Sequence, residues 1–74
     1  MKITGIVTNI IYRNEENAYS IMAVKTDDSD ITCVGTMPFF DVGDKVEIIG
    51  DFVYHDKYGE QILVSKIKLL KPKG

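Results

Sequence analysis

The fold class of this chain is decided by the stretch KVEIIGDFVY, residues 45–54. One phase of a period of two holds Val46, Ile48, Phe52 and Tyr54, with Gly50 between them, while Glu47 and Asp51 fall on the other. Successive side chains of a strand point to opposite faces of a sheet, so this alternation is typical of a strand with one buried face. It predicts a long strand whose apolar side packs against a core.

Four more runs of β-branched and aromatic residues surround this stretch, and no apolar residues recur at helical spacing for long enough to compete. The five predicted strands are Lys2–Tyr12, Tyr19–Thr26, Ile31–Met37, Lys45–Tyr54 and Gln61–Leu70. In the second run both phases are rather apolar, with Tyr19, Ile21 and Ala23 on one and Ser20, Met22 and Val24 on the other.

The breaks between the runs carry turn residues. Asp27–Asp30 predicts a tight polar hairpin, and residues 56–59 predict a second one in which Gly59 takes positive φ. Residues 38–44 are too few for the helix that often joins the third and fourth strands of such barrels. Phe39 or Phe40 is therefore expected to plug the barrel bottom.

The apolar phase of the last run changes near Ser65, with Ile62 and Val64 in one phase and Ile67 and Leu69 in the other. Such a change indicates a bulge or sharp coil, which a small barrel needs in order to close. Gly5 and Gly35 are expected to serve similar bends. Together these features predict an all-β, five-stranded Greek-key barrel of the OB type with little or no helix.

Length and composition limit the chain to one small domain, expected to span residues 1–74. The single cysteine, Cys33, excludes an intrachain disulfide and a cysteine-based zinc site. No apolar run approaches the ~20 residues that a membrane-spanning helix needs. Met1–Gly5 does not resemble a signal peptide, so a cytoplasmic location without membrane contact is expected. Lys71–Gly74 is expected to be a tail at a domain boundary.

Charge is unevenly distributed along the chain. The net charge is −2, which argues against strong nucleic-acid binding by this domain alone. Residues 1–56 carry −6 and residues 57–74 carry +4. The lysines of the second part either solubilise the last strand and tail or meet phosphate.

No residue constellation for catalysis is present. His55 and Cys33 are the only residues of their types, neither has a sequence-evident partner, and there is no Gly-rich nucleotide loop. Cys33 is expected to be an inert core thiol, and no metal site is expected around His55. The chain is therefore not expected to be an enzyme by itself, nor to hold a cofactor.

Two segments between strands are candidates for ligand contact, and each has a structural alternative. In residues 12–19, Tyr12 and Tyr19 could stack on unpaired bases while Arg13 meets phosphate, or the tyrosines could staple the base of a hairpin. In residues 54–61, a stacking platform could form from Tyr54, Tyr58, Lys57 and His55, or this segment could be a plain β-turn with Tyr58 folded onto the barrel rim. In an OB barrel both loops flank a ligand face across the second and third strands.

Both segments also carry a family resemblance. The strings IIYRNEENAYSI (residues 10–21) and HDKYGEQI (residues 55–62) resemble the opening of RecD-like DNA helicases of the YrrC branch. Shorter matches follow in the same order along the chain, at Gly5-Ile6-Val7, Val34-Gly35, Val42-Gly43-Asp44 and Gly50-Asp51-Phe52. The chain departs from the family pattern at Ala18, Asp56 and Phe52, where Gly, Pro and Trp are usual. An alanine at position 18 argues against a positive φ there.

The resemblance implies an accessory OB-type domain at the front of an ATP-driven 5′-to-3′ DNA helicase. ATP and Mg²⁺ are then expected for motor domains outside this chain only. The leading hypothesis is weak contact with single-stranded DNA: Arg13 and Lys57 on phosphates, Tyr12, Tyr19 and Tyr58 on bases, and His55 and Gln61 in polar contacts. The alternative is a structural module that docks on other domains of the same helicase or on a partner protein without touching DNA.

Overall fold

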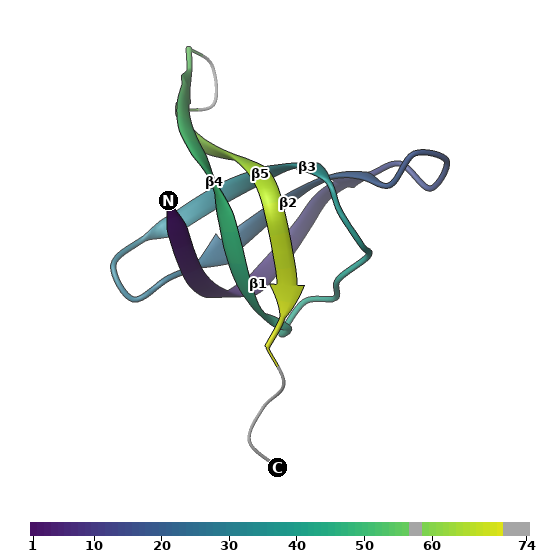
Figure 1. The fold of residues 1–74 in the computed structure, drawn as a ribbon, viewed down its shortest axis with the longest axis horizontal. Helices are drawn as coiled ribbons and strands as arrows, with labels where there is room; N and C mark the ends of the chain where they lie inside the picture. The colour runs from purple at the N-terminus through teal and green to yellow at the C-terminus, as the bar shows by residue number, and fades with distance from the viewer. Residues whose placement is uncertain (57–58, 71–74) are drawn as a thin grey trace.

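A computed structural model describes residues 1–56 and 59–70, which form a closed barrel of five strands and contain no helix (Figure 1). The strands are β1 (Lys2–Arg13), β2 (Tyr19–Lys25), β3 (Asp30–Thr36), β4 (Lys45–His55) and β5 (Gly59–Leu69). They follow one another around the barrel in the order β1-β2-β3-β5-β4. Only the β3–β5 pair is parallel, so the predicted Greek-key barrel is confirmed. In this described part, no helix is long and apolar enough to cross a bilayer.

The strand ends lie within two residues of those predicted, because the breaks contain residues with clear turn chemistry. In the hairpin at Asp27–Asp30, the Thr26 N–H donates to the Ser29 carbonyl at 2.9 Å, and the Thr26 hydroxyl accepts from the Ser29 N–H at 3.1 Å. Gly59 has φ of 78°, as predicted for the last hairpin. Lys57 and Tyr58 lie outside the described residues.

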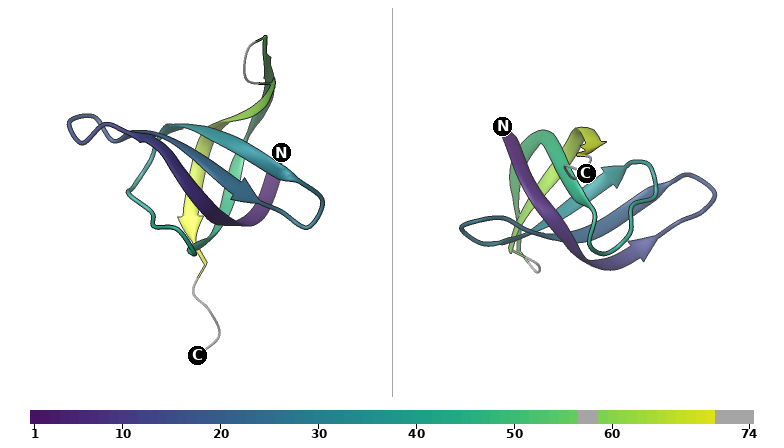
Figure 2. Two further views of the ribbon diagram at one scale, coloured as in Figure 1. Left: turned by 180° about the vertical axis from the view of Figure 1, so that it is seen from behind. Right: turned by 90° about the horizontal axis from the view of Figure 1, so that it is seen from below.

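β1 closes the barrel by pairing with two strands in succession. Its first residues, Lys2 to Ile6, pair with β4, and its continuation to Arg13 pairs with β2. Gly5 lies at the changeover, where a Cβ would come within 2.6 Å of the Lys25 carbonyl oxygen. The missing side chain lets β1 bend closely over the end of β2, as Figure 2 shows from below. Gly5 therefore has the bending role that the sequence predicts.

The predicted bulge in β5 is also present. Ile49 of β4 pairs with Lys66, but the next residue, Gly50, pairs with Val64, so Ser65 is the extra residue of β5. Gly50 lies opposite, and a Cβ there would overlap the Leu63 carbonyl oxygen and crowd the Ile62 side chain. The bulge and the glycine together let the β4–β5 ladder coil sharply around the barrel.

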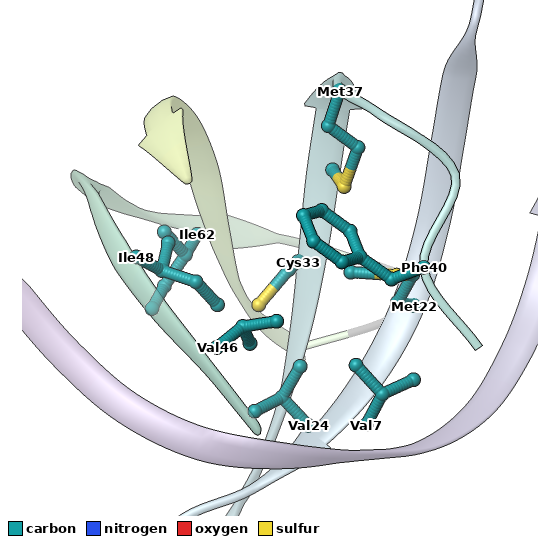
Figure 3. Packing of buried hydrophobic residues seen from close by; sticks show 9 residues of the cluster. All are labelled: Val7, Met22, Val24, Cys33, Met37, Phe40, Val46, Ile48 and Ile62. Carbon is teal, nitrogen blue, oxygen red and sulfur yellow. The ribbon is translucent and has the colours of Figure 1, made fainter. Parts of the chain in front are cut away.

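The core is a single cluster of apolar side chains inside the barrel (Figure 3). It comprises Val7, Met22, Val24, Cys33, Met37, Phe40, Val46, Ile48 and Ile62. Of the two candidate plugs, Phe40 is buried and Phe39 is exposed. Cys33 is buried as predicted, and burial raises the pKa of its thiol to about 12. It remains a protonated core side chain at neutral pH.

One prediction about β4 needs correction. Val46 and Ile48 are buried, but Phe52 and Tyr54, which continue the same phase, are exposed. The reason is visible in Figure 1, where the β4–β5 hairpin extends beyond the barrel. The side chains of β4 beyond Gly50 therefore have no core to pack against, although they continue to alternate.

Candidate functional site

A row of outward-facing side chains crosses four strands of the barrel at one level. Tyr12 of β1 pairs with Ile21 of β2, Ile21 pairs with Val34 of β3, and Val34 pairs with Leu63 of β5. Ile21, Val34 and Leu63 lie on the outer side of the barrel, because their chain neighbours Ser20, Met22, Cys33 and Ile62 are buried inside it. Tyr12 lies on the same side as its partner Ile21. We call Tyr12, Ile21, Val34 and Leu63 the cross-strand row.

The cross-strand row is apolar and connects the bases of two hairpins. Leu63 is 48% exposed, whereas Val34 is 6% exposed although it is not part of the core cluster. Ile21 and Leu63 flank Val34 on the two neighbouring strands and shield it. The β1–β2 and β4–β5 hairpins leave the barrel in different directions (Figures 1 and 2). The cross-strand row runs over the barrel surface from Tyr12 of β1 to Leu63 of β5.

Tyr12 and Tyr19 lie together at the β1–β2 end of the row. Their ring centroids are 6.3 Å apart and the planes are inclined by 60°, an edge-to-face arrangement. Both rings remain exposed. The tyrosines thus form the cross-strand staple that one interpretation of the sequence predicts, and they still present aromatic surface to solvent.

Two asparagines hold the turn that joins these tyrosines. The Asn14 side-chain oxygen accepts from the Glu16 N–H at 2.9 Å, and the Asn17 side-chain oxygen accepts from the Tyr19 N–H at 3.0 Å. Ala18, between Asn17 and Tyr19, has φ of 61°. The expectation that alanine would avoid positive φ here is wrong, because the hairpin hydrogen bonds impose a left-handed residue at this position.

Arg13 lies on the opposite face from Tyr12. It pairs with the buried Ser20, and its guanidinium donates to the Phe40 carbonyl and lies 4.6 Å from the Phe39 ring centroid. Arg13 therefore ties the β1–β2 hairpin to the segment that plugs the barrel. Phosphate contact by Arg13 stays a prediction, and it would require the guanidinium to leave these partners.

The other predicted site residues belong to the second hairpin. Gln61 pairs with Thr32 and shares the outward phase of Leu63, so it borders the cross-strand row. The His55 backbone pairs with Gly59, and its side chain lies outside what the structure describes, as do Lys57 and Tyr58. The structure thus brings Tyr12, Tyr19 and Gln61 to one face.

The charges around the row do not favour phosphate. Glu15 and Glu16 are exposed in the adjacent turn, and Asp51 pairs with Leu63. The exposed lysines on the same strands lie at other levels than the row: Lys2 begins β1, Lys25 ends β2, and Lys66 and Lys68 follow the bulge of β5. No group of three potential metal ligands occurs in residues 1–56 and 59–70. The face is suited to stacking and apolar contact rather than to charge-driven or metal-dependent binding.

Sequence reasoning missed Ile21, Val34 and Leu63 as part of this face. A signal was present, because the second predicted strand is apolar on both phases. A half-buried strand of an antiparallel sheet normally has one polar face. The second apolar face marked an outward surface, but its partners on β3 and β5 depend on a register that one strand does not reveal.

Comparison with known proteins places the chain in a family. A family model described as the OB-fold domain of the ATP-dependent DNA helicase YrrC matches residues 1–72. No curated protein and no solved structure matched the chain. Because the match covers nearly the whole sequence, this chain belongs to the family of YrrC helicase OB-fold domains.

Proposed function

We propose that this OB-fold domain contributes to its helicase as an accessory domain that contacts single-stranded DNA weakly through the Tyr12–Tyr19 end of the cross-strand row. The observation that carries the proposal is the pair of exposed tyrosines, 6.3 Å apart, held by a hydrogen-bonded turn beside an apolar row. Unpaired bases have apolar faces, and such a rigid aromatic edge offers them a surface for stacking.

The expected affinity is low because few cations converge on this face. Stacking contributes about 1–3 kcal/mol per base, which for one or two bases supports only weak binding. Glu15 and Glu16 oppose the approach of phosphates, and Arg13 is engaged with Phe39 and Phe40. The domain would then guide a strand that the motor domains hold, with ATP and Mg²⁺ serving those domains alone.

A second candidate function is docking against another domain of the helicase without DNA contact. The observation in its favour is the apolar centre of the row, where Ile21, Val34 and Leu63 adjoin on three strands. An apolar surface of this kind loses water on protein contact and depends little on salt.

The test is a fluorescence-anisotropy titration of the chain with labelled oligothymidylate at low salt. The double variant Tyr12→Ala/Tyr19→Ala is expected to weaken binding at least about tenfold, since it removes both stacking surfaces. The double variant Tyr12→Phe/Tyr19→Phe keeps the rings and is expected to bind normally. Val42→Ala, at an exposed site in the β3–β4 loop, serves as a control.

Circular dichroism accompanies each variant, because the tyrosines also staple their hairpin. If the native chain fails to bind oligothymidylate at high protein concentration, the stacking proposal is overturned and docking becomes the better account. Equal binding by the alanine and phenylalanine variants, both folded, would move any DNA contact away from this face. A Lys57→Ala/Arg13→Ala variant measures the phosphate contribution separately.

A further inference from the structure

On one side of the closed barrel, β3 and β5 pair along only a short part of their length. They pair through Thr32–Val34 and Gln61–Leu63, shortly before the bulge at Ser65. Past this point lies a groove of about 530 Å³. It is lined by residues from the end of β3, the segment after it, β4 and β5, namely Thr36, Pro38, Glu47, Ile49 and residues 64–68.

Backbone groups on both sides of this groove point into it. The Leu70 N–H donates to the Lys45 carbonyl at 2.8 Å, so by alternation Lys66 and Lys68 bond toward β4. The N–H and C=O groups of Ile67 then face the groove, those of Leu69 lie on the same edge of β5 just past it, and no ladder partner for either residue occurs among the described residues. On the other side, Met37 bonds to Ala18, which leaves Thr36 facing the groove by the same alternation.

The groove combines an apolar floor with a positive rim. Ile67 and Val64 pack against the core and form the floor. On the rim, one carboxylate, Glu47, binds both Lys2 at 3.0 Å and Lys68 at 3.3 Å. Lys66 has no ion-pair partner in the described part of the chain. The rim thus has more lysines than carboxylates in a protein whose net charge is −2.

We propose that this groove binds an extended acidic peptide segment of a partner protein, added as a short strand along the edge of β5. Apolar side chains of the peptide would meet Val64 and Ile67, and the alternating acidic side chains would lie beside Lys66 and Lys68. The edge from Ser65 to Leu69 accommodates about five residues at ~3.3 Å per residue.

Peptide is favoured over nucleic acid by the groups that the groove presents. Open strand edges are satisfied in register by the N–H and C=O groups of another strand, which a sugar–phosphate chain does not offer. The floor is aliphatic rather than aromatic, so it offers nucleic-acid bases no ring on which to stack. This site lies apart from the cross-strand row, so neither proposal depends on the other.

The experiment uses the ¹⁵N-labelled chain and two capped peptides, Val-Glu-Val-Glu-Val and Val-Lys-Val-Lys-Val. The acidic peptide is expected to shift the amide signals of Thr36 and residues 65–69 and to slow hydrogen exchange at Ile67 and Leu69. The basic peptide is expected to bind at least about fivefold more weakly, as rim charges of this exposure contribute up to ~1 kcal/mol.

Two variants and a control locate the contact. Leu69→Pro removes an N–H on the unpaired edge of β5 along which the peptide would lie and spares the ladder to β4, so it is expected to weaken acidic-peptide binding about tenfold. Lys66→Glu is expected to weaken it about fivefold, whereas Lys25→Glu, exposed on β2, is expected to have no effect.

Three results would overturn the proposal. The first is the absence of shifts at millimolar acidic peptide. The second is a shift of the same amides by oligothymidylate in place of the peptide, which would make the groove a nucleic-acid site. The third is concentration dependence of these amides without peptide, which would show that a second copy of the chain fills the groove.

Discussion

The two sides of this barrel differ in how far their neighbouring strands stay paired. On the closed side, the cross-strand row runs over four consecutive hydrogen-bonded strands, and the bends of β1 and of its hairpin depend on the bare Gly5 and on the backbone conformation at Ala18. On the open side, β3 and β5 pair only as far as Val34 and Leu63, and Lys2, Glu47 and Lys68 add ion pairs across β1, β4 and β5, which remain hydrogen-bonded. The groove thus begins where the extra residue of β5 lies.

Deletion of Ser65 should break this contrast most strongly. Without Ser65 the ladder becomes regular, because Lys66 still pairs with Ile49 and Ile67 with Ile48, so the later side chains of β5 keep their faces. The sharp coil that the bulge gives to β5, and that closure of so small a barrel needs, is lost. The deletion variant is expected to lose at least about 4 kcal/mol of unfolding free energy, measured by urea denaturation, out of about 4–11 kcal/mol for a domain of this length. A deletion variant as stable as the native chain would show that the barrel closes without the bulge.

Gly50→Ala tests the same place from the opposite strand. The added Cβ would overlap the Leu63 carbonyl oxygen, which is backbone and cannot rotate away. The expected loss is about 2–4 kcal/mol of unfolding free energy, measured by urea denaturation. Gly43→Ala is the control for loop glycines, because a Cβ at that position meets nothing within 4 Å, although its φ of 98° adds strain of its own. A loss no larger than the control's would contradict the close approach.

Ala18→Gly sharpens the description of the closed side. The left-handed conformation costs alanine about 1–2 kcal/mol, and glycine avoids this cost. Part of the resulting gain in stability is offset because glycine has more conformational freedom in the unfolded chain. The variant is expected to be more stable by about 0.5–1 kcal/mol, which corresponds to a rise of roughly 2–8 °C in Tm. A fall in Tm would mean that the turn does not hold position 18 at positive φ.

The open side should show the smallest and most pH-dependent effect. Hydrogen bonding from Lys2 lowers the pKa of Glu47 from its ordinary value of 4.5, aided by the bond from Lys68 and opposed by burial. A lowered folded-state pKa stabilises the fold above the unfolded value, and this stabilisation is lost as the pH falls through the folded pKa. The Tm difference between native chain and Glu47→Gln should therefore be constant near neutral pH and shrink below pH 4.5. A difference independent of pH and salt would exclude the ion pairs as its source.

Most of the fold followed from local patterns in the sequence. Turn residues predicted each strand end to within two residues of its observed position, and the change of apolar phase near Ser65 located the bulge correctly. Features that depend on partners did not follow. Ile10 packs on the core while Ile11 is exposed, because β1 shifts register against β2 on both sides of Asn9 and Ile10. The same dependence on partners governs where Arg13 points and which residues complete the cross-strand row.

The pairing of β1 with β4 has a consequence for how the chain acquires its structure. Lys2 meets Ile49, so the first strand cannot complete its hydrogen bonds until the fourth strand exists. The β1–β2–β3 meander can form early, because its strands are neighbours in the sequence. Closure of the barrel pairs β1 with β4, which lie far apart in the sequence, and therefore costs the conformational entropy of a long loop. Folding is therefore expected on the millisecond-to-second scale of β-barrels. During synthesis on a ribosome, the first residues of β1 would wait with an unpaired edge until β4 has emerged.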